Sequence, residues 1–182
     1  MLFNSLEYLI FLPTVYVLYW FVFNKNLKLQ NLFLLFASYT FYGWWDWRFL
    51  SLILISSLTD YWIGIKLENN HDERLRKNLK YLSLAVNLGF LGVFKYYNFF
   101  VDSFVDLLQA FGLNPSVNTL KILLPVGISF YTFQTVGYTL DIYKRRYKAE
   151  RNLVNFMVYV CFFPQLVAGP IERGKTLLPQ FR

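Results

Sequence analysis

The sequence predicts an all-α fold: a polytopic transmembrane helical bundle with about six membrane helices and one interfacial amphipathic helix. Two observations predict it. Hydrophobic residues make up 56% of the 182 residues and aromatic residues 21%, which is more apolar surface than a soluble domain of this size can bury. These residues also gather in long stretches between short charged loops, as expected where lipid covers the protein. The six stretches are residues 8–23, 32–45, 49–65, 81–94, 122–140 and 153–168.

The stretches are short for membrane helices, because an upright spanning helix needs about 20 residues. Their ends must therefore extend into the interface, or the local membrane must be thin. The first stretch does not resemble a signal peptide. It follows Glu7 without any Lys or Arg, and no small-residue cleavage site follows Phe23. We expect a retained helix there.

The interfacial helix is predicted between residues 95 and 120. Apolar residues recur there at helical spacing, with Asp102, Asp106 and Gln109 on the opposite face. This pattern is typical of a helix that lies in the interface or covers the mouth of a cavity. Gly112 and the pair Asn114-Pro115 are expected to end it.

The charge distribution predicts the orientation. The formal net charge is +7, but the basic residues lie in short loops, which indicates membrane orientation instead of nucleic-acid binding. Loops 24–31, 66–80 and 141–151 hold 12 of the 18 lysines and arginines. We therefore expect these loops to be cytoplasmic, with the N-terminus outside.

Two polar residues in the third and fourth stretches lie at the same depth. Asp60 precedes Lys66 by six residues and Asn87 follows Lys80 by seven, which places both roughly 9–10 Å inside the predicted cytoplasmic end. A short loop joins the two stretches. The pattern predicts a hydrogen bond between the two side chains. The alternative is that they bind substrate or protons.

The fifth stretch carries a polar sector. Gly127, Tyr131, Gln134, Tyr138 and Asp141 fall within about 80° of a helical wheel. Such a face should line a cavity or form a polar seam with another helix, because lipid cannot satisfy it.

The sixth stretch should break at membrane depth, since Pro164, Gly169 and Pro170 interrupt it. Irregular backbone at that depth is tolerated only inside protein or beside water. We therefore expect Gln165 and Pro170 to lie near the cavity of the fifth helix. The single cysteine, Cys161, cannot form an intrachain disulfide and is expected to pack as a small hydrophobe.

Two motifs resemble signatures of the membrane-bound O-acyltransferases. Residues 124–134 read Leu-Pro-Val-Gly-Ile-Ser-Phe-Tyr-Thr-Phe-Gln and continue to Tyr138, Asp141 and Tyr143; residues 163–171 read Phe-Pro-Gln-Leu-Val-Ala-Gly-Pro-Ile. Their order and spacing match as well. Residues 1–5 and the Phe-Tyr-Gly-Trp of 41–44 are similar to the bacterial alginate O-acetyltransferase branch. The related D-alanyl transferases of teichoic acid share much of this pattern.

The resemblance implies transfer of an acyl group, in this branch acetyl, to a hydroxyl of an extracytoplasmic polysaccharide such as alginate. It also implies a multi-pass protein of the bacterial cytoplasmic (inner) membrane. It implies three partners, which are the lipid bilayer, the polysaccharide acceptor and other polysaccharide-modification proteins, and it implies no nucleic acid. No bound cofactor is expected, and the acyl donor is left open. The family's histidine, a candidate general base, lies in a later helix.

This chain departs from the family at the histidine. Its only one is His71, in a charged loop among Asn69, Asn70, Asp72 and Glu73. We therefore expect 1–182 to be the N-terminal part of an acyltransferase domain, without a catalytic residue of its own. No metal-ligand spacing, phosphate loop or nucleophile–base pair is visible. A transporter or channel, or a non-enzymatic scaffold subunit, would also suit a polar membrane interior.

The orientation can be tested by labelling with an impermeant thiol reagent. In a Cys161→Ser background, Asn70→Cys and Arg146→Cys should resist labelling from outside the cell and react after the membrane is permeabilised. A Ser5→Cys variant, at the predicted outside end, should react in intact cells. Labelling of position 70 or 146 from outside would reverse the orientation.

Overall fold

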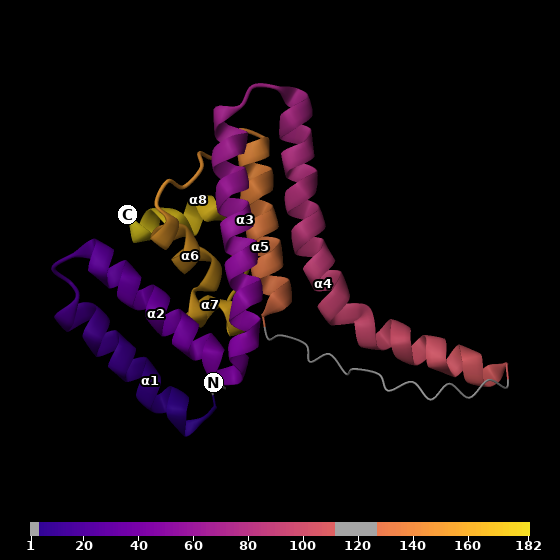
Figure 1. Cartoon of the computed structure of the whole chain (residues 1–182). Helices are drawn as coiled ribbons and strands as arrows, with labels where there is room; N and C mark the ends of the chain where they lie inside the picture. Colours follow the sequence, from indigo (N-terminus) through magenta and orange to yellow (C-terminus); the bar gives the residue numbers. More distant parts are fainter. Residues whose placement is uncertain (1–3, 112–126) are drawn as a thin grey trace.

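The computed structural model describes residues 4–111 and 127–182 (Figure 1). Every regular element among these residues is a helix, so the predicted all-α class is confirmed. The helices form two neighbouring groups, one of α1 and α2 and one of α3, α4 and α5, with the short C-terminal helices packed between them (Figure 1).

The first group is an antiparallel pair. α1 (Leu6–Val17) passes into a π-helical turn, Leu18–Val22, and α2 covers Leu27–Asp46. Each helix starts at a side-chain cap: the hydroxyl of Ser5 accepts from the Tyr8 backbone N–H at 3.2 Å, and the Asn26 side-chain oxygen accepts from Lys28 N–H at 3.0 Å. Aromatic contacts hold the pair together, with the Tyr8 and Phe41 rings 6.0 Å apart.

The second group contains α3 (Leu50–Asn69), α4 (Glu73–Ala110) and α5 (Ile128–Tyr143). α3 packs against both of the others. Gly64 permits the close approach of α3 to α5, because a Cβ atom there would lie 3.0 Å from Tyr138 Cε1 and 3.1 Å from Ile142 Cδ1. Small residues at such a crossing are typical of membrane helix pairs.

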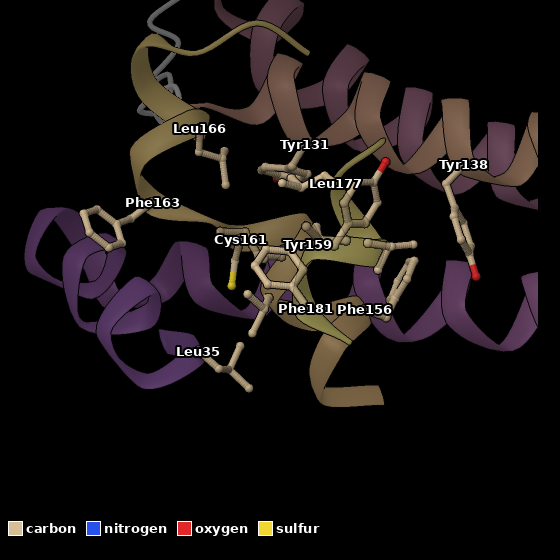
Figure 2. Packing of buried hydrophobic residues seen from close by; sticks show 14 of the residues in the cluster. Leu35, Tyr131, Tyr138, Phe156, Tyr159, Cys161, Phe163, Leu166, Leu177 and Phe181 are labelled. Carbon is tan, nitrogen blue, oxygen red and sulfur yellow. The ribbon is translucent and has the colours of Figure 1, made fainter. Parts of the chain in front are cut away.

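The C-terminal elements are short. α6 (Leu153–Cys161) begins at Asn152, whose side chain accepts from Val154 N–H at 2.9 Å. α7 (Phe163–Ala168) and α8 (Gly174–Leu177) follow, and a 3₁₀ turn covers Leu178–Phe181. The predicted break of the sixth stretch is confirmed and falls at Phe162, whose backbone leaves the helical region between α6 and α7. Figure 2 shows the core around this break, where Phe156, Tyr159 and Cys161 are fully buried.

Six separate membrane spans are not confirmed. Two helical segments among the described residues are long and apolar enough to cross a membrane: Leu27–Asn69, which joins α2 and α3 through the 3₁₀ turn Trp47–Phe49, and Glu73–Ala110. The apolar helices Leu6–Val22 and Leu153–Leu166 are shorter. The break at Phe162 divides the last stretch, and residues 122–126 of the fifth lie outside the described residues.

A further difference concerns α4. The sequence predicts a span at 81–94 and a separate interfacial helix at 95–120, whereas the structure has one helix of 38 residues. Hydropathy changes along it, but no proline interrupts the backbone, so the helix continues. Its distal part leaves the bundle (Figure 1) and exposes apolar side chains such as Phe100 and Phe104. The predicted end at Gly112 and Asn114-Pro115 lies outside the described residues.

Replacing Gly64 tests the close packing of α3 on α5. Gly64→Val should lower the free energy of unfolding by about 1–3 kcal/mol, because the new side chain overpacks the contact with Tyr138. Gly137→Ala is the matched control: a Cβ added there would meet no atom within 4 Å, so it should be neutral or more stable by about 0.5–1 kcal/mol. Equal effects of both variants on denaturation in detergent micelles would contradict the close packing of α3 on α5.

Candidate functional site

A carboxylate lies at the centre of the second helix group. Asp60 on α3 is fully buried. Its Oδ2 accepts a hydrogen bond from Asn87 Nδ2 on α4 at 2.6 Å, and its Oδ1 accepts from Thr139 Oγ1 on α5 at 3.1 Å and from Ser83 Oγ. The predicted contact between Asp60 and Asn87 is therefore confirmed. A buried carboxylate needs such donors, since lipid and apolar side chains supply none.

The amide of Asn87 extends this cluster. Its Oδ1 accepts from Ser56 Oγ at 2.6 Å and from Thr135 Oγ1 at 3.1 Å, and its Nδ2 also donates to the Ser83 carbonyl at 2.9 Å. Thr135 and Thr139 form a stripe beside the predicted polar sector of α5. The sequence shows the stripe but does not indicate that it faces Asp60, because the rotation of α5 about its axis depends on packing.

The polar sector of α5 faces α6. Tyr131, Gln134 and Tyr138 are buried, so their interior orientation is confirmed. Gln134 Nε2 donates to the Tyr159 carbonyl at 2.6 Å, and Tyr159 Oη donates to the Gln134 carbonyl at 3.2 Å. This reciprocal pair joins α5 to α6 as a polar seam. Asp141, at the end of the sector, is half-buried.

Tyr138 is enclosed on three sides. Its ring lies 4.7 Å from that of Phe156 (Figure 2), and Gly64 and Gly174 both approach it, with a Cβ at either position 3.0–3.1 Å from the ring. Its Oη accepts from the Glu150 backbone N–H at 2.9 Å. Tyr138 thus fixes α5 relative to α3, α6 and the α5–α6 loop.

Several buried hydroxyls have no hydrogen-bond partner among the described residues. Those of Ser57, Thr132, Tyr42 and Tyr131 belong to α2, α3 and α5. Tyr42 lies beside Gly127: a Cβ at Gly127 would be 2.9 Å from Tyr42 Oη. Gly127 has φ of 77°, which favours glycine at this position. Buried hydroxyls are usually paired with protein or water, so these four are unusual in having no partner among the described residues.

The segment after the break is tied back to the bundle. Gln165 is buried, and its Nε2 donates to the Pro170 carbonyl at 2.9 Å. Pro170 itself is exposed, and it contacts Gln165 through its backbone carbonyl. The position of both residues near a cavity of α5 stays a prediction. The Glu172 carbonyl accepts from Tyr159 Oη at 3.4 Å. Gln165 and Tyr159 therefore hold both ends of this segment.

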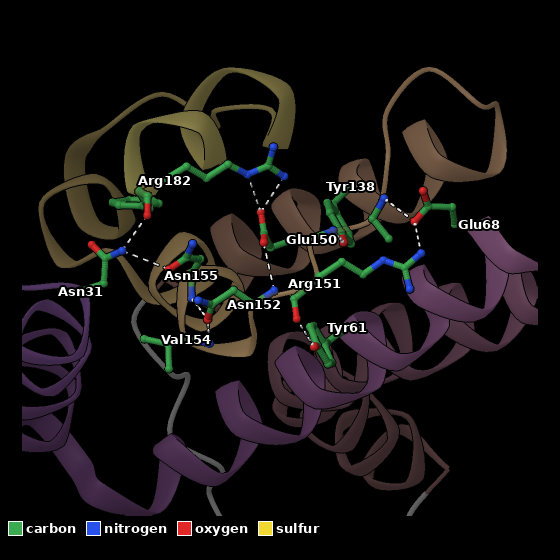
Figure 3. A network of polar contacts seen from close by, with 12 residues as sticks. Asn31, Tyr61, Glu68, Tyr138, Glu150, Arg151, Asn152, Val154, Asn155 and Arg182 are labelled. Carbon is green, nitrogen blue, oxygen red and sulfur yellow. Dashed lines mark hydrogen bonds and ion pairs between the residues drawn. The ribbon is translucent and has the colours of Figure 1, made fainter. Parts of the chain in front are cut away.

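A second polar network joins the C-terminus to the α5–α6 loop (Figure 3). Glu150 is buried, and Arg182 Nη2 donates to its Oε2 at 2.8 Å. That carboxylate raises the pKa of Arg182 above its ordinary value. Asn31 Nδ2 on α2 donates to Asn155 Oδ1 at 3.0 Å and to the Phe181 carbonyl at 2.6 Å. The sequence does not predict this network. Its one local sign is Glu150, an acidic residue in an otherwise basic loop.

His71 lies in the loop between α3 and α4 and is exposed, as its charged sequence context predicts. Cys161 is buried in the core, also as predicted. Neither residue belongs to the hydrogen-bonded cluster around Asp60.

Comparison with known proteins identifies relatives over the whole chain. A Pseudomonas putida protein named "probable alginate O-acetylase AlgI" is 42% identical over 184 residues, which is 100% of this chain and 37% of that protein. Further curated proteins of that name share 37–42% identity across the whole chain. The chain is a homologue of alginate O-acetylase. Its resemblance to the alginate branch of the membrane-bound O-acyltransferases is therefore confirmed. Together with the apolar helices, this indicates a membrane location.

Two other relatives have names that specify different acceptors. The peptidoglycan O-acetyltransferase of Helicobacter pylori is 29% identical over 100% of this chain and 39% of its own length. The teichoic acid D-alanyltransferase of Lacticaseibacillus rhamnosus is 30% identical over 56% of this chain and 21% of its own length. The chain spans about a third of the length of the alginate O-acetylases that it matches. No protein-family model and no solved structure matches it.

A double-mutant cycle tests the Asp60–Asn87 contact. Asp60→Ala and Asn87→Ala should each destabilise the protein, and their coupling free energy should be about 0.6–1.7 kcal/mol, the range for polar contacts between membrane helices. Ser103→Ala on the exposed part of α4 is a control, with an expected change within about 0.5 kcal/mol. Strictly additive losses in reversible unfolding would show that the contact contributes nothing.

Proposed function

We propose that the protein to which this chain belongs transfers an acyl group, in the first instance acetyl, to hydroxyls of an extracytoplasmic polysaccharide of the alginate type. One observation carries the proposal: 42% identity to a protein named alginate O-acetylase over the whole chain. The order of the motifs at 124–134 and 163–171 supports it, and Tyr131, Gln134 and Gln165, which belong to the described parts of these motifs, are buried.

Within that function, we assign residues 1–182 the membrane scaffold and part of a passage for substrate. The Asp60–Asn87 cluster fixes α3, α4 and α5. We place the passage beside Gly127, where Tyr42 Oη and Leu166 lie close to the backbone. The buried hydroxyls of Tyr42 and Tyr131, which have no partner among the described residues, support this placement. Hydroxyl and amide groups there suit a polar acceptor, which itself offers hydroxyl donors and acceptors. Gln165 directly precedes Leu166 in the chain, and Leu166 lies against Gly127.

The general base is proposed to lie outside residues 1–182. Activation of an acceptor hydroxyl needs a group with a pKa near neutrality within hydrogen-bond reach. The only histidine, His71, is exposed in the α3–α4 loop. Asp60 is already occupied by three donors and serves as a structural acceptor.

A second candidate is transfer of D-alanine to teichoic acid, favoured by the match to the D-alanyltransferase. That match covers 56% of this chain, whereas the O-acetylase matches cover 100%. Acetyl transfer is therefore the first choice. If the protein were a transporter, substrate would cross the membrane without formation of a new ester. If it were a scaffold, neither transport nor ester formation would be observed.

Complementation tests this function. The complete reading frame that encodes this chain, expressed in an alginate-producing bacterium that lacks its own O-acetylase, should restore acetyl esters on secreted alginate, measured by NMR. His71→Ala should retain the activity, because that residue lies outside the proposed passage. Residues 1–182 alone should restore none.

The alternatives give different products in matched hosts. D-alanyl esters on teichoic acid, or acetyl esters on peptidoglycan, would assign the corresponding acceptor in place of alginate. Ester formation by residues 1–182 alone would contradict the placement of the general base outside them. Absence of any ester with the complete, membrane-inserted protein would contradict acyl transfer altogether.

A further inference from the structure

A basic cavity lies where the end of α3, the start of α4 and the end of α5 meet. Its volume is about 590 Å³, within the usual range for small-molecule sites. Arg76 connects the three helices there, since its guanidinium donates to the carbonyls of Leu67, Asn70 and Tyr143. Among the described residues, the charged groups in its lining are five cations and one carboxylate: Arg76, Arg145, Arg146, Lys148, Arg182 and Glu68.

Most of this positive charge is not neutralised within the described part of the chain. Glu68 Oε2 accepts from Arg151 Nη2 at 3.0 Å, so the one carboxylate is already paired with a cation outside the lining. Arg182 pairs with Glu150 at 2.8 Å. The remaining four lining cations form no ion pair with a described carboxylate, and like charges around one cavity repel one another.

Two buried donors in the lining also lack acceptors. Arg76 is 2% exposed, and its Nη atoms donate to backbone carbonyls, but its Nε has no partner among the described residues. The buried Tyr147 Oη likewise has none, and burial raises the pKa of Tyr147, so its hydroxyl stays protonated. Buried donors are nearly always satisfied. Both donors belong to residues of the cavity lining and are left without an acceptor by the described part of the chain.

The backbone at Arg145 gives a third, independent observation. α5 ends in a Schellman turn, in which Arg145 N–H donates to the Ile142 carbonyl at 2.9 Å and Arg146 N–H to that of Asp141 at 2.8 Å. Arg145 occupies the left-handed position, with φ of 57°, where glycine is usual. An arginine here strains the backbone and places a cation at the cavity.

We propose that this cavity binds a phosphate-bearing anion. Guanidinium groups match phosphate oxygens with paired hydrogen bonds, and Arg145 and Arg146 bring two of them to the lining without a carboxylate partner among the described residues. Two sources share this chemistry: a soluble phosphorylated molecule and the headgroup of an anionic phospholipid. The inference is independent of the acyltransferase proposal, because it rests on the cavity alone.

The test uses the purified protein in nanodiscs of phosphatidylcholine, titrated with inorganic pyrophosphate at constant ionic strength and followed by calorimetry and thermal unfolding. A second arm replaces part of the phosphatidylcholine with phosphatidylglycerol and omits pyrophosphate. The anion should raise the melting temperature in at least one arm. Arg145→Gly should be at least as stable as the unmodified protein without ligand, because glycine relieves the strained turn, yet bind the effective anion about tenfold more weakly.

Lys144→Gln is the matched control, since it removes a cation from the same turn but not from the cavity lining; it should bind as the unmodified protein does. Arg146→Gln provides a second lining variant and should also weaken binding. Stabilisation by pyrophosphate assigns a soluble ligand, and stabilisation by phosphatidylglycerol alone assigns a headgroup. No stabilisation in either arm, or equal losses in Arg145→Gly and Lys144→Gln, would overturn the site.

Discussion

The arrangement of α3, α4 and α5 depends on the solvation of one carboxylate. Asp60 is fully buried among apolar helices, where an unsatisfied acceptor costs several kcal/mol. Its donors come from both neighbouring helices, Ser83 and Asn87 on α4 and Thr139 on α5. Rotation or sliding of either helix would remove at least one donor. The polar cluster therefore selects one register among the many that apolar packing alone would accept.

The C-terminal segment completes the bundle through close packing. Tyr138 is held between Gly64, Gly174 and the ring of Phe156, so the approach of α3 and the position of α8 both depend on the same ring. The short helices α6 and α7 are separated by the break at Phe162, and α6 is nevertheless the most completely buried helix of the chain's described part. The carbonyl of Tyr159, near the end of α6, accepts from the side chain of Gln134, so this backbone group next to the break is satisfied.

The two ends of the bundle differ in chemistry. At one end, Tyr42 Oη lies beside Gly127, and the buried hydroxyls of Tyr42 and Tyr131 have no partner among the described residues. At the other end, Arg76, Arg145 and their neighbours form a cationic cavity, which suits an anion. The Asp60 cluster lies between them on α3 and holds no cation among its hydrogen-bonding partners.

Local signals in the sequence were enough to establish the all-α class, the burial of Cys161, the break near Pro164 and the contact between Asp60 and Asn87. The helical class and the burial of Cys161 follow from hydropathy, and the break follows from the geometry of proline. The contact follows from the short loop between the third and fourth stretches, which places Asp60 and Asn87 at the same depth. The continuity of α4 emerged only from the fold, because the sequence shows a change in hydropathy but no signal for where a helix leaves the bundle. The same holds for the threonine stripe that faces Asp60 and for the cavity shared by Arg76, Tyr147 and Arg182. Helix rotation and contacts between distant segments are set by packing, and one sequence contains no local signal for either.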